Sequence, residues 1–371
     1  MAPNCVIEFD DNPQGIYHAG QTLSGKVELR LDKPEPVNGF NLIVSGYAEV
    51  DWSERDDEKS ESFSGVEKLL RKHTTLIAPR KEGAIEIPAG IHRYKFSCAL
   101  PSDLPTSFEG KYGKIRYIVC ATLDRPWKFN QTCKVAFTVL KPLDLNRDPV
   151  LGQPKRLEVV ERFCCWPCRS RPLQITVEIP ASGYVPGQKI PVTVTLNNAS
   201  SITLRGVKCS LDRTEYYISE TPYQKCNTVS RTLAHASTTV TNDVYWRTVL
   251  QLDIPSVAPT GECSILNMNY ELNIIINVES CRIDPKLQIP ITIGTVPLAT
   301  TTSSSSPSAN YGSFDDCQPP TAPLLASTDW LADPPSYHEA VHGVPVNVNE
   351  DPHAIGSQTY VPRYPVYFKS K

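Results

Sequence analysis

The pattern Tyr-x-x-Gly-Gln occurs twice in this 371-residue chain, as Tyr17-His18-Ala19-Gly20-Gln21 and as Tyr184-Val185-Pro186-Gly187-Gln188. Each copy precedes, at the same spacing, a segment in which apolar and polar residues alternate. A glycine-containing turn before such a segment indicates the start of a β-strand. The two copies therefore suggest that one structural unit is present twice.

A second pair of matches follows in the same order. Residues 101–106 are Pro-Ser-Asp-Leu-Pro-Thr and residues 255–260 are Pro-Ser-Val-Ala-Pro-Thr, and after each comes a predicted strand with an early tyrosine, Tyr117 or Tyr270. Each match alone is weak, because glycine and proline mark turns in most proteins. The shared order and similar spacing nevertheless predict a duplication.

The alternation itself predicts β-structure. Residues 23–31 and 40–50 alternate with a period of two and are bounded by Pro, Gly, Asn and Asp, which is typical of an antiparallel sandwich. Further strands are expected at residues 68–76, 91–100, 114–123 and 132–140, and a second series from Leu173 to Ile293. The polar run from Ser53 to Ser64 is interpreted as a solvated hairpin loop.

The predicted fold class is all-β, with two tandem antiparallel immunoglobulin-like β-sandwich lobes followed by a disordered C-terminal tail. The first lobe is assigned to residues 1–145 and the second to residues 172–296. Residues 146–171, which contain several prolines and little periodicity, are expected to form an interlobe linker. Residues 297–371 are the tail, because their Ser, Thr and Pro content cannot bury enough apolar area to order the chain.

The tail contains Pro334-Pro335-Ser336-Tyr337. Two consecutive prolines favour a polyproline II conformation, which fits the aromatic groove of a WW domain. Pro334, Pro335 and Tyr337 are the expected WW-binding residues. The alternative is a chance proline turn in a proline-rich segment. Val361-Pro362-Arg363-Tyr364 lacks the first proline, so Pro362 and Tyr364 are a degenerate second candidate site.

Composition excludes some classes of function. A net charge of −3 is not that of a nucleic-acid-binding protein, which would be strongly basic. The first eleven residues lack the pattern of a secretion signal, and no apolar run is long enough to span a bilayer. The twelve cysteines are therefore expected to be reduced thiols in a cytoplasmic protein.

No catalytic motif is evident. The sequence has no His-x-x-x-His pair, no glycine-rich phosphate loop and no Gly-x-Ser-x-Gly elbow. We therefore expect a protein that is not an enzyme and that has no cofactor or metal. Residues distant in sequence could still converge, so this expectation rests on absence alone.

The chain resembles the α-arrestins, the arrestin domain-containing proteins, over essentially its whole length. The features that carry the resemblance are the two Tyr-x-x-Gly-Gln stretches, Pro-Thr-Ser-Phe-Glu-Gly-Lys-Tyr-Gly at residues 105–113, Ile115-Arg116-Tyr117, Arg125-Pro126-Trp127, Cys164-Cys165-Trp166-Pro167-Cys168, Pro334-Pro335-Ser336-Tyr337 and Pro362-Arg363-Tyr364-Pro365-Val366-Tyr367. The resemblance implies two arrestin lobes, each a seven- or eight-stranded sandwich, and an unstructured tail. Members often carry two Pro-Pro-x-Tyr motifs, whereas this chain has one complete copy.

The resemblance also implies partners. They are a WW-domain HECT-type ubiquitin ligase at the tail and transmembrane receptors or transporters, the cargo, at the lobes. The expected function is that of a cytosolic adaptor that is recruited to the plasma membrane and endosomes and promotes ubiquitination, endocytosis and protein transport. The alternative is a retromer-like structural scaffold that acts without a ligase.

Two further groups are candidate sites. In arrestin-like folds the face around Lys111, Lys114 and Arg116 meets phosphorylated tails or acidic lipids, although a solvated basic loop explains the same charges. Cys164, Cys165 and Cys168 are interpreted as a buried cluster at the lobe interface. The alternative is palmitoylation beside neighbouring arginines, which would give peripheral membrane contact.

Overall fold

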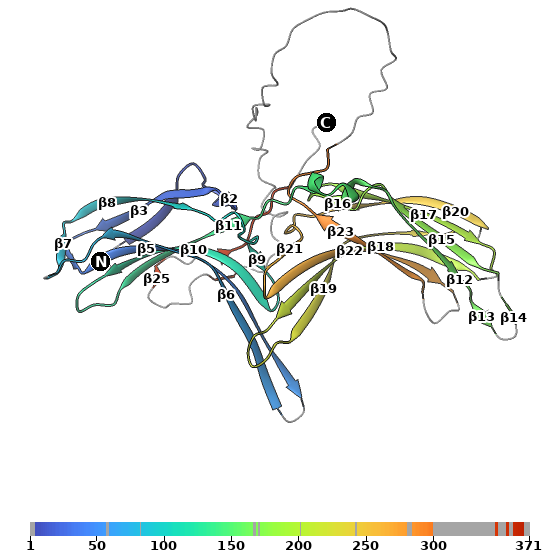
Figure 1. Cartoon of the computed structure of the whole chain (residues 1–371), viewed down its shortest axis with the longest axis horizontal. Coiled ribbons are helices and arrows are strands. Elements are labelled where there is room, and N and C mark those ends of the chain that lie inside the picture. The colour runs from blue at the N-terminus through green and yellow to red at the C-terminus, as the bar shows by residue number, and fades with distance from the viewer. Residues whose placement is uncertain are drawn as a thin grey trace, which may run out of the picture.

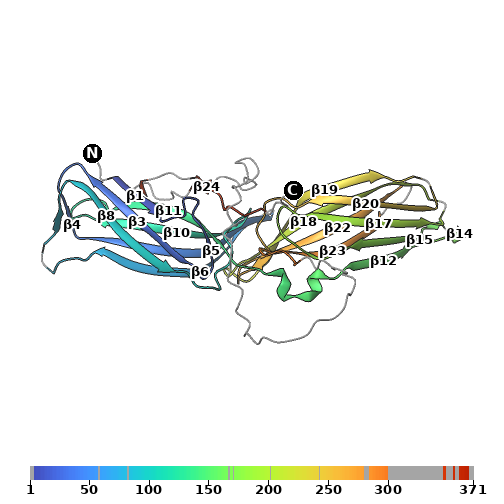
Figure 2. The ribbon, with the colours of Figure 1, turned by 90° about the horizontal axis from the view of Figure 1, so that it is seen from above.

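The computed structural model describes residues 4–56, 59–81, 83–165, 168–169, 171–200, 202–241, 243–279, 284–299, 346–347, 354–355 and 359–366. Two β-sandwich lobes lie end to end and meet at a central junction (Figures 1 and 2). The prediction of an all-β chain with two sandwich lobes is confirmed. No helix in the described part of the chain is long and apolar enough to cross a bilayer.

The first lobe packs a three-stranded sheet against a larger one. The small sheet has the order β1 (Asn4–Phe9), β3 (Thr22–Leu31) and β8 (Gly90–Ala99). The large sheet has the order β2 (Ile16–His18), β11 (Gln131–Leu140), β10 (Gly113–Asp124), β5 (Gly39–Asp56) and β6 (Lys59–Ile77), with β9 (Phe108–Glu109) on β10 and β25 (Ala354–Ile355) on β11. Two short strands, β4 (Glu35–Val37) and β7 (Ile85–Ile87), pair at the outer end.

The second lobe repeats this plan. One sheet has the order β12 (Lys155–Glu161), β15 (Leu173–Ile179), β17 (Lys189–Asn198) and β20 (Tyr245–Asp253). The other has the order β16 (Gly183–Tyr184), β23 (Lys286–Ile293), β22 (Leu266–Val278), β18 (Leu204–Ile218) and β19 (Cys226–Thr239), with β21 (Gly261–Glu262) on β22. The second lobe also carries a short hairpin of β13 (Cys164–Cys165) and β14 (Cys168–Arg169). The remaining short elements lie outside the two sandwiches: the 3-10 helices η1 (Leu145–Arg147) and η2 (Pro149–Gly152), and the paired strands β24 (Val346–Asn347) and β26 (Thr359–Tyr360).

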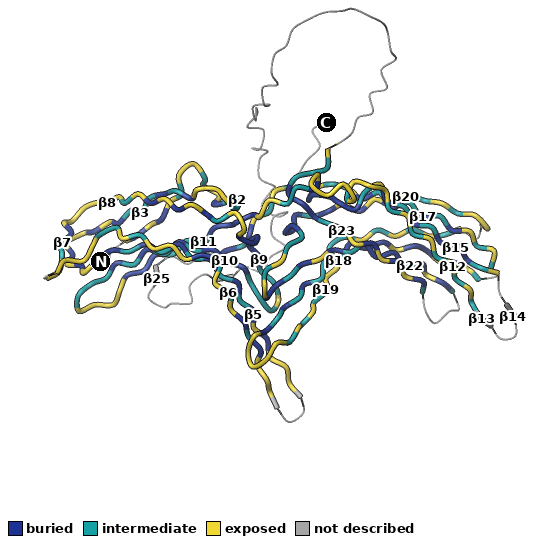
Figure 3. Tube along the Cα trace, in the orientation of Figure 1, coloured by how far each residue is buried: buried dark blue, intermediate teal, exposed yellow. Residues whose placement is uncertain are grey.

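Alternation places the apolar side chains inside. In β3 and β17 every second residue is buried, which gives each lobe a core between its two sheets (Figure 3). Replacing one leucine of such a row by alanine costs about 2–5 kcal/mol. The core of the first lobe also includes Tyr217, Leu266 and Met268 of the second lobe, so apolar packing continues across the junction.

The duplicated turn has the same geometry in both lobes. Gly20 and Gly187 both have φ of 90°, a conformation that strains any residue with a Cβ atom. The glutamine that follows accepts a hydrogen bond from the backbone amide three residues before it, at 2.7 Å for Gln21 and 3.0 Å for Gln188. The pattern Tyr-x-x-Gly-Gln is therefore a turn that closes on its own glutamine side chain.

The two matched tyrosines also have equivalent roles. The hydroxyl of Tyr117 donates to the carbonyl of Pro105 at 2.7 Å, and the hydroxyl of Tyr270 donates to the carbonyl of Ala258 at 2.5 Å. Both bonds span twelve residues and fix the loop before the strand onto the strand itself. The shared hydrogen bonds support the prediction of a duplication.

The loop predicted from Ser53 to Ser64 is wrong. The β5–β6 ladder continues through it, and the last pair is Asp56 with Lys59. Trp52 and Phe63 explain the difference, because their rings stack at 5.4 Å between the polar residues and bury this side of the hairpin.

The predicted linker of residues 146–171 is also too long. β12 pairs with β15 along its whole length, from Lys155 with Ile179 to Glu161 with Leu173, and is an edge strand of the second lobe. Its Leu157 and Val159 pack partly on the core of that lobe. Of the predicted linker, the part that runs between the two sandwiches is the short segment with η1 and η2.

Most of the predicted tail, residues 297–371, lies outside the described residues, and so does Cys281. Within the tail, the structure describes a segment that is hydrogen-bonded to both lobes, residues 359–366, which we name the strap. It follows β25, which pairs with β11 of the first lobe, and it crosses the junction between the lobes. In the described part of the chain, seven cysteines are thiols outside any disulfide: Cys5, Cys98, Cys133 and Cys209 are buried, Cys120 and Cys263 are half-buried, and Cys226 is exposed.

Candidate interlobe site

The junction is formed by the inner ends of both lobes. The β5–β6 hairpin meets the loop after β18, where the amide of Ser64 donates to the carbonyl of Thr221 at 2.9 Å. Nearby, the Lys225 ammonium lies 2.5 Å from the Glu54 carboxylate. Phe63 packs edge to face on Tyr223 at 5.4 Å. These contacts fix the orientation of one lobe relative to the other.

The loop before β10 brings the first lobe against β18. The amide of Gly110 donates to the carbonyl of Gly113 at 2.9 Å, and the amide of Lys111 donates to the hydroxyl of Tyr217 at 3.0 Å. A Cβ atom on Gly110 would overlap that hydroxyl. The glycines of the stretch Phe-Glu-Gly-Lys-Tyr-Gly therefore allow the backbone to approach Tyr217 closely.

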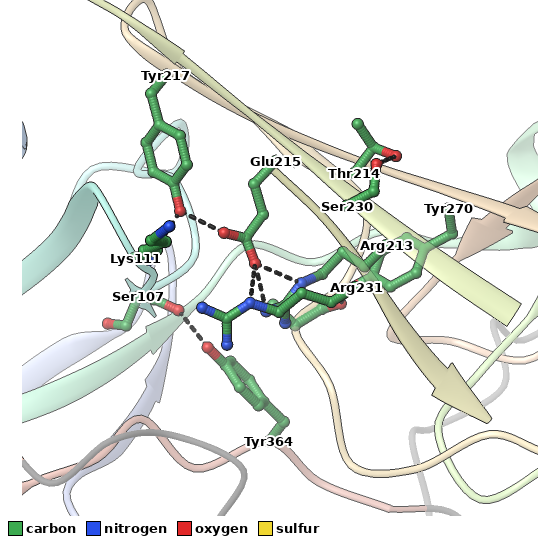
Figure 4. Close-up of polar contacts among 11 residues, drawn as sticks. Ser107, Lys111, Arg213, Thr214, Glu215, Tyr217, Ser230, Arg231, Tyr270 and Tyr364 are labelled. Atoms are coloured by element: carbon green, nitrogen blue, oxygen red, sulfur yellow. Dashed lines mark hydrogen bonds and ion pairs between the residues drawn. The ribbon is translucent and has the colours of Figure 1, made fainter. Parts of the chain in front are cut away.

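A buried charged group lies on the other side of this contact (Figure 4). Glu215 is fully buried, and its carboxylate contacts the Arg213 guanidinium at 2.5 Å and that of Arg231 at 4.0 Å. Tyr217 donates its hydroxyl to the same carboxylate. Burial, and then the negative charge of Glu215, raise the pKa of Tyr217. A buried carboxylate is stable here only because these three groups satisfy it.

The first lobe contributes a second buried pair. Both carboxylate oxygens of Glu109 accept hydrogen bonds from Arg116, at 2.8 and 3.1 Å, and both side chains are almost completely buried. Burial raises the pKa of Glu109, while the charge of Arg116 opposes that shift. The bidentate geometry commits the Arg116 guanidinium to this carboxylate.

The strap lies across both lobes. The hydroxyl of Tyr364 donates to the Ser107 carbonyl of the first lobe at 2.9 Å, and the Tyr364 carbonyl accepts from the Ser256 hydroxyl of the second lobe at 2.9 Å. Tyr364 is partly buried as a residue, but burial of its hydroxyl raises its pKa well above the usual value. The hydroxyl of Tyr360 donates to the Phe137 carbonyl at 3.1 Å, and burial raises the pKa of Tyr360 to about 12.

This arrangement is suited to holding an extended peptide. Backbone carbonyls and serine hydroxyls accept and donate hydrogen bonds to the strap, and apolar side chains of both lobes, such as Leu140 and Val257, line the small cleft beside Tyr364. Within the described residues, no group of three His, Cys, Asp or Glu side chains is arranged to hold a metal ion. The groups at the junction are therefore suited to binding a peptide.

The predicted basic residues do not form one exposed group. Lys111 is exposed and lies over the ring of Tyr112, whereas the Lys114 ammonium contacts Glu49 at 3.1 Å and is mostly buried. Arg116 is buried with Glu109, so its assignment as a surface contact is wrong. A contact of Lys111 and Lys114 with phosphate or acidic lipid stays a prediction.

The other predicted sites are placed as follows. Pro362 and Tyr364 face the lobes in the strap, so in this arrangement they are not presented to a WW domain. Pro334, Pro335 and Tyr337 lie outside the described residues.

The predicted cysteine cluster has a different place in the fold. Cys164, Cys165 and Cys168 belong to the β13–β14 hairpin, in which Cys165 is opposite Cys168, but their side chains are outside the described part. That hairpin is at the outer end of the second lobe, so the predicted location at the lobe interface is wrong. Whether these cysteines are acylated stays a prediction.

Sequence reasoning missed the charged group of β18. Its signal was nevertheless present, because Arg213, Glu215 and Tyr217 are spaced by two and must share one face of a strand. A face with an acid, a base and a tyrosine inside an otherwise apolar strand indicates a buried polar contact.

Comparisons with known proteins agree with this geometry. The family model of the arrestin (or S-antigen) N-terminal domain matches residues 5–146, and that of the arrestin (or S-antigen) C-terminal domain matches residues 169–298. Arrestin domain-containing protein 17 of Caenorhabditis elegans is 32% identical over 302 residues, which cover 77% of this chain and 69% of that protein. Arrestin domain-containing protein 4 of Mus musculus is 30% identical over 348 residues, covering 90% and 80%, and arrestin domain-containing protein 1 of Rattus norvegicus is 24% identical over 329 residues, covering 88% and 72%.

Proposed function

This chain belongs to the arrestin domain-containing family, the α-arrestins, and is an arrestin-type adaptor; we propose that it brings a WW-domain HECT-type ubiquitin ligase to membrane-protein cargo. The lobes bind a cytoplasmic segment of a transmembrane receptor or transporter. The ligase binds Pro334, Pro335 and Tyr337. Ubiquitination then follows from proximity, because the two partners are held at a high effective concentration.

The observation that supports cargo binding is the strap. An extended segment of this chain occupies the junction and makes hydrogen bonds to both lobes through Tyr360 and Tyr364. A surface that holds one extended peptide offers the hydrogen-bonding groups and apolar contacts that another needs. Exposed Lys111 lies beside this junction and is suited to an acidic or phosphorylated cargo segment.

The ligase motif lies, in sequence, between two points at which the chain contacts the lobes. Before it, the amide of Val296 donates to the carbonyl of Leu143 at 3.2 Å, and after it comes the strap. We propose that the segment between them presents Pro334, Pro335 and Tyr337 close to the bound cargo. Action of this kind places the protein in the cytoplasm, with recruitment to the plasma membrane and endosomes during endocytosis and protein transport.

The test is a pull-down from cells with the full chain, read by mass spectrometry for WW-domain ligases and membrane proteins together. Tyr337→Ala should lower ligase capture at least about tenfold, which corresponds to about 1.4 kcal/mol of binding free energy. Capture of membrane proteins should be unchanged. The matched control is Tyr311→Ala, since Tyr311 lies in the same part of the sequence but outside a Pro-Pro-x-Tyr motif.

The outcome that would overturn the proposal is ligase capture at the wild-type level by Tyr337→Ala, and by a protein in which Tyr364 is changed as well. Cargo sorting that survives deletion of residues 298–371 would instead favour the retromer-like scaffold, which needs no ligase.

A further inference from the structure

The loop between β10 and β11, residues 125–130, lies at the end of the first lobe that is far from the junction. β10 begins beside the Tyr217 contact and runs for 12 residues, so its last residue is about 36 Å away. There Asp124 pairs with Gly39, and Gly39 lies next to Pro79. β4, residues 32–34 and residues 78–81 are therefore its neighbours.

Trp127 in this loop is completely exposed, with 103% of its reference surface in contact with solvent. Phe129 is 74% exposed. The backbone of Trp127 has φ of 61°, in the left-handed region that a bulky side chain rarely adopts. Because Trp127 is fully exposed, packing against the described residues does not offset this strain, and the fold alone does not explain a tryptophan here.

The loop is held in this shape by a buried carboxylate. Arg125 donates from Nε and Nη2 to the carbonyl of Phe129, at 3.0 and 2.6 Å. The Lys128 ammonium lies 2.7 Å from Glu35, and Arg125 Nη1 lies 3.7 Å from the same carboxylate, which is only 5% exposed. The loop of residues 125–130 is thus joined to β4, and its backbone holds the exposed aromatic side chains of Trp127 and Phe129 in place.

We propose that Trp127 and Phe129 insert into the interfacial layer of a phospholipid bilayer and anchor the first lobe there. Tryptophan favours this layer because its ring is apolar while its N–H group can still reach water or headgroups. The inference extends the membrane contact of the proposed adaptor, but it concerns a different surface from the junction and needs neither ligase nor cargo.

The surroundings favour lipid over a protein partner. The exposed residues on the neighbouring loops include Lys33, Arg80 and Lys81, and lysine is depleted at the centre of protein interfaces, whereas beside a bilayer its side chain reaches the headgroups. The exposed aromatic surface of Trp127 and Phe129 is also small. Two aromatic side chains fall well short of the roughly 800 Å² that each partner buries in a stable protein interface.

The aromatic side chains, and not a net charge, provide the attraction. Asp32 and Glu86 are exposed at the same end of the lobe and offset part of the basic charge. We therefore expect binding to neutral vesicles, with a moderate gain when the vesicles contain anionic lipid. A basic surface without the aromatic anchor would bind anionic vesicles only.

The experiment is flotation of the purified full chain with phosphatidylcholine vesicles, with and without a share of phosphatidylserine. Trp127→Gly is the main variant, because glycine adopts the left-handed backbone freely and should keep or raise the melting temperature. Trp127→Gly should lower vesicle binding at least tenfold. Adding Phe129→Ser to that variant should lower the binding further. Tyr245→Ser is the matched control, since Tyr245 is a 62% exposed aromatic residue of the second lobe.

A second readout separates insertion from adsorption. Vesicles of brominated phosphatidylcholine should quench tryptophan emission of the wild-type protein and not that of Trp127→Gly, although all other tryptophans remain. Equal vesicle binding by the wild type and Trp127→Gly would overturn the proposal. A wild-type protein that does not bind vesicles would also overturn the proposal. Capture of a soluble protein through Trp127 would not rescue it.

Discussion

Replacing Tyr364 by alanine should release the strap while leaving both lobes folded. The change removes a partly buried ring, worth about 2 kcal/mol of apolar burial, and a hydrogen bond to the Ser107 carbonyl at 2.9 Å, worth about 1 kcal/mol. The sum of about 3 kcal/mol raises the equilibrium population of released strap roughly 150-fold. Both contacts join the strap to the first lobe and neither lies within a sandwich, so the stability of either lobe should change little.

Hydrogen exchange measures this population directly, because an amide exchanges only when its hydrogen bond opens. The amide of Arg363 donates to the Thr138 hydroxyl at 3.3 Å and reports on the strap. Tyr364→Ala should speed its exchange by the factor given above. Tyr364→Phe removes only the hydroxyl, so about fivefold faster exchange is expected from about 1 kcal/mol.

The control is Tyr245→Ala, which removes an exposed tyrosine of the second lobe and should leave Arg363 exchange unchanged. Exchange in Tyr364→Ala within about twofold of the wild type would refute the reasoning, because it would mean that Tyr364 contributes less than about 0.5 kcal/mol to holding the strap.

Two other predictions concern the junction and its neighbourhood. Tyr217→Phe leaves the amide of Lys111 without its acceptor and removes a donor from Glu215. The change should lower the free energy of unfolding by about 1.5–3 kcal/mol and the calorimetric melting temperature by several degrees. An unchanged melting temperature would contradict the assigned hydrogen bonds. Burial lowers the pKa of His18 below 6.5, so the unfolded chain takes up the proton first and stability should fall as the pH drops below about 6.5. His18→Gln should make the urea midpoint less sensitive to pH between about 7.5 and 5.5, and an equally steep dependence would argue against a role of His18.

The two-lobe architecture was predictable because it depends on local signals that occur twice. Gly20 and Gly187 lie in turns that only a residue without a Cβ atom adopts easily, and each is followed by a glutamine that closes the turn. The alternation of apolar residues then defines the inner face of each strand without reference to distant parts of the chain.

Where local signals were weak, the prediction failed in a specific way. The tip of the β5–β6 hairpin is rich in charged and hydroxyl residues, and its strand character depends on one stacked pair, Trp52 and Phe63. β12 has an edge position, so only Leu157 and Val159 mark its inner face. A period-two pattern carried by so few residues is easily mistaken for a linker.

The junction could not be predicted from periodicity at all. Lys111 and Tyr217 are 106 residues apart, and Ser107 and Tyr364 are 257 apart, so their contacts follow from the packing of complete lobes. The sequence did indicate that Tyr364 belongs to a proline-containing motif. It did not indicate that the same tyrosine is used inside the molecule.

The contact of Tyr364 with the lobes also bears on how the Pro334-Pro335-Ser336-Tyr337 motif would act. Because the chain contacts the lobes before residue 300 and again in the strap, a ligase bound as proposed at Pro334, Pro335 and Tyr337 would be held by a segment tethered at both ends. Releasing the strap removes one tether, but loop entropy depends only weakly on length, so the effective concentration of ligase at the cargo should fall by a small factor. Loss of Tyr337 would remove the proposed ligase contact itself. The effects of Tyr364→Ala and Tyr337→Ala on ligase capture should therefore differ greatly in size, although both change a tyrosine of a proline-containing motif.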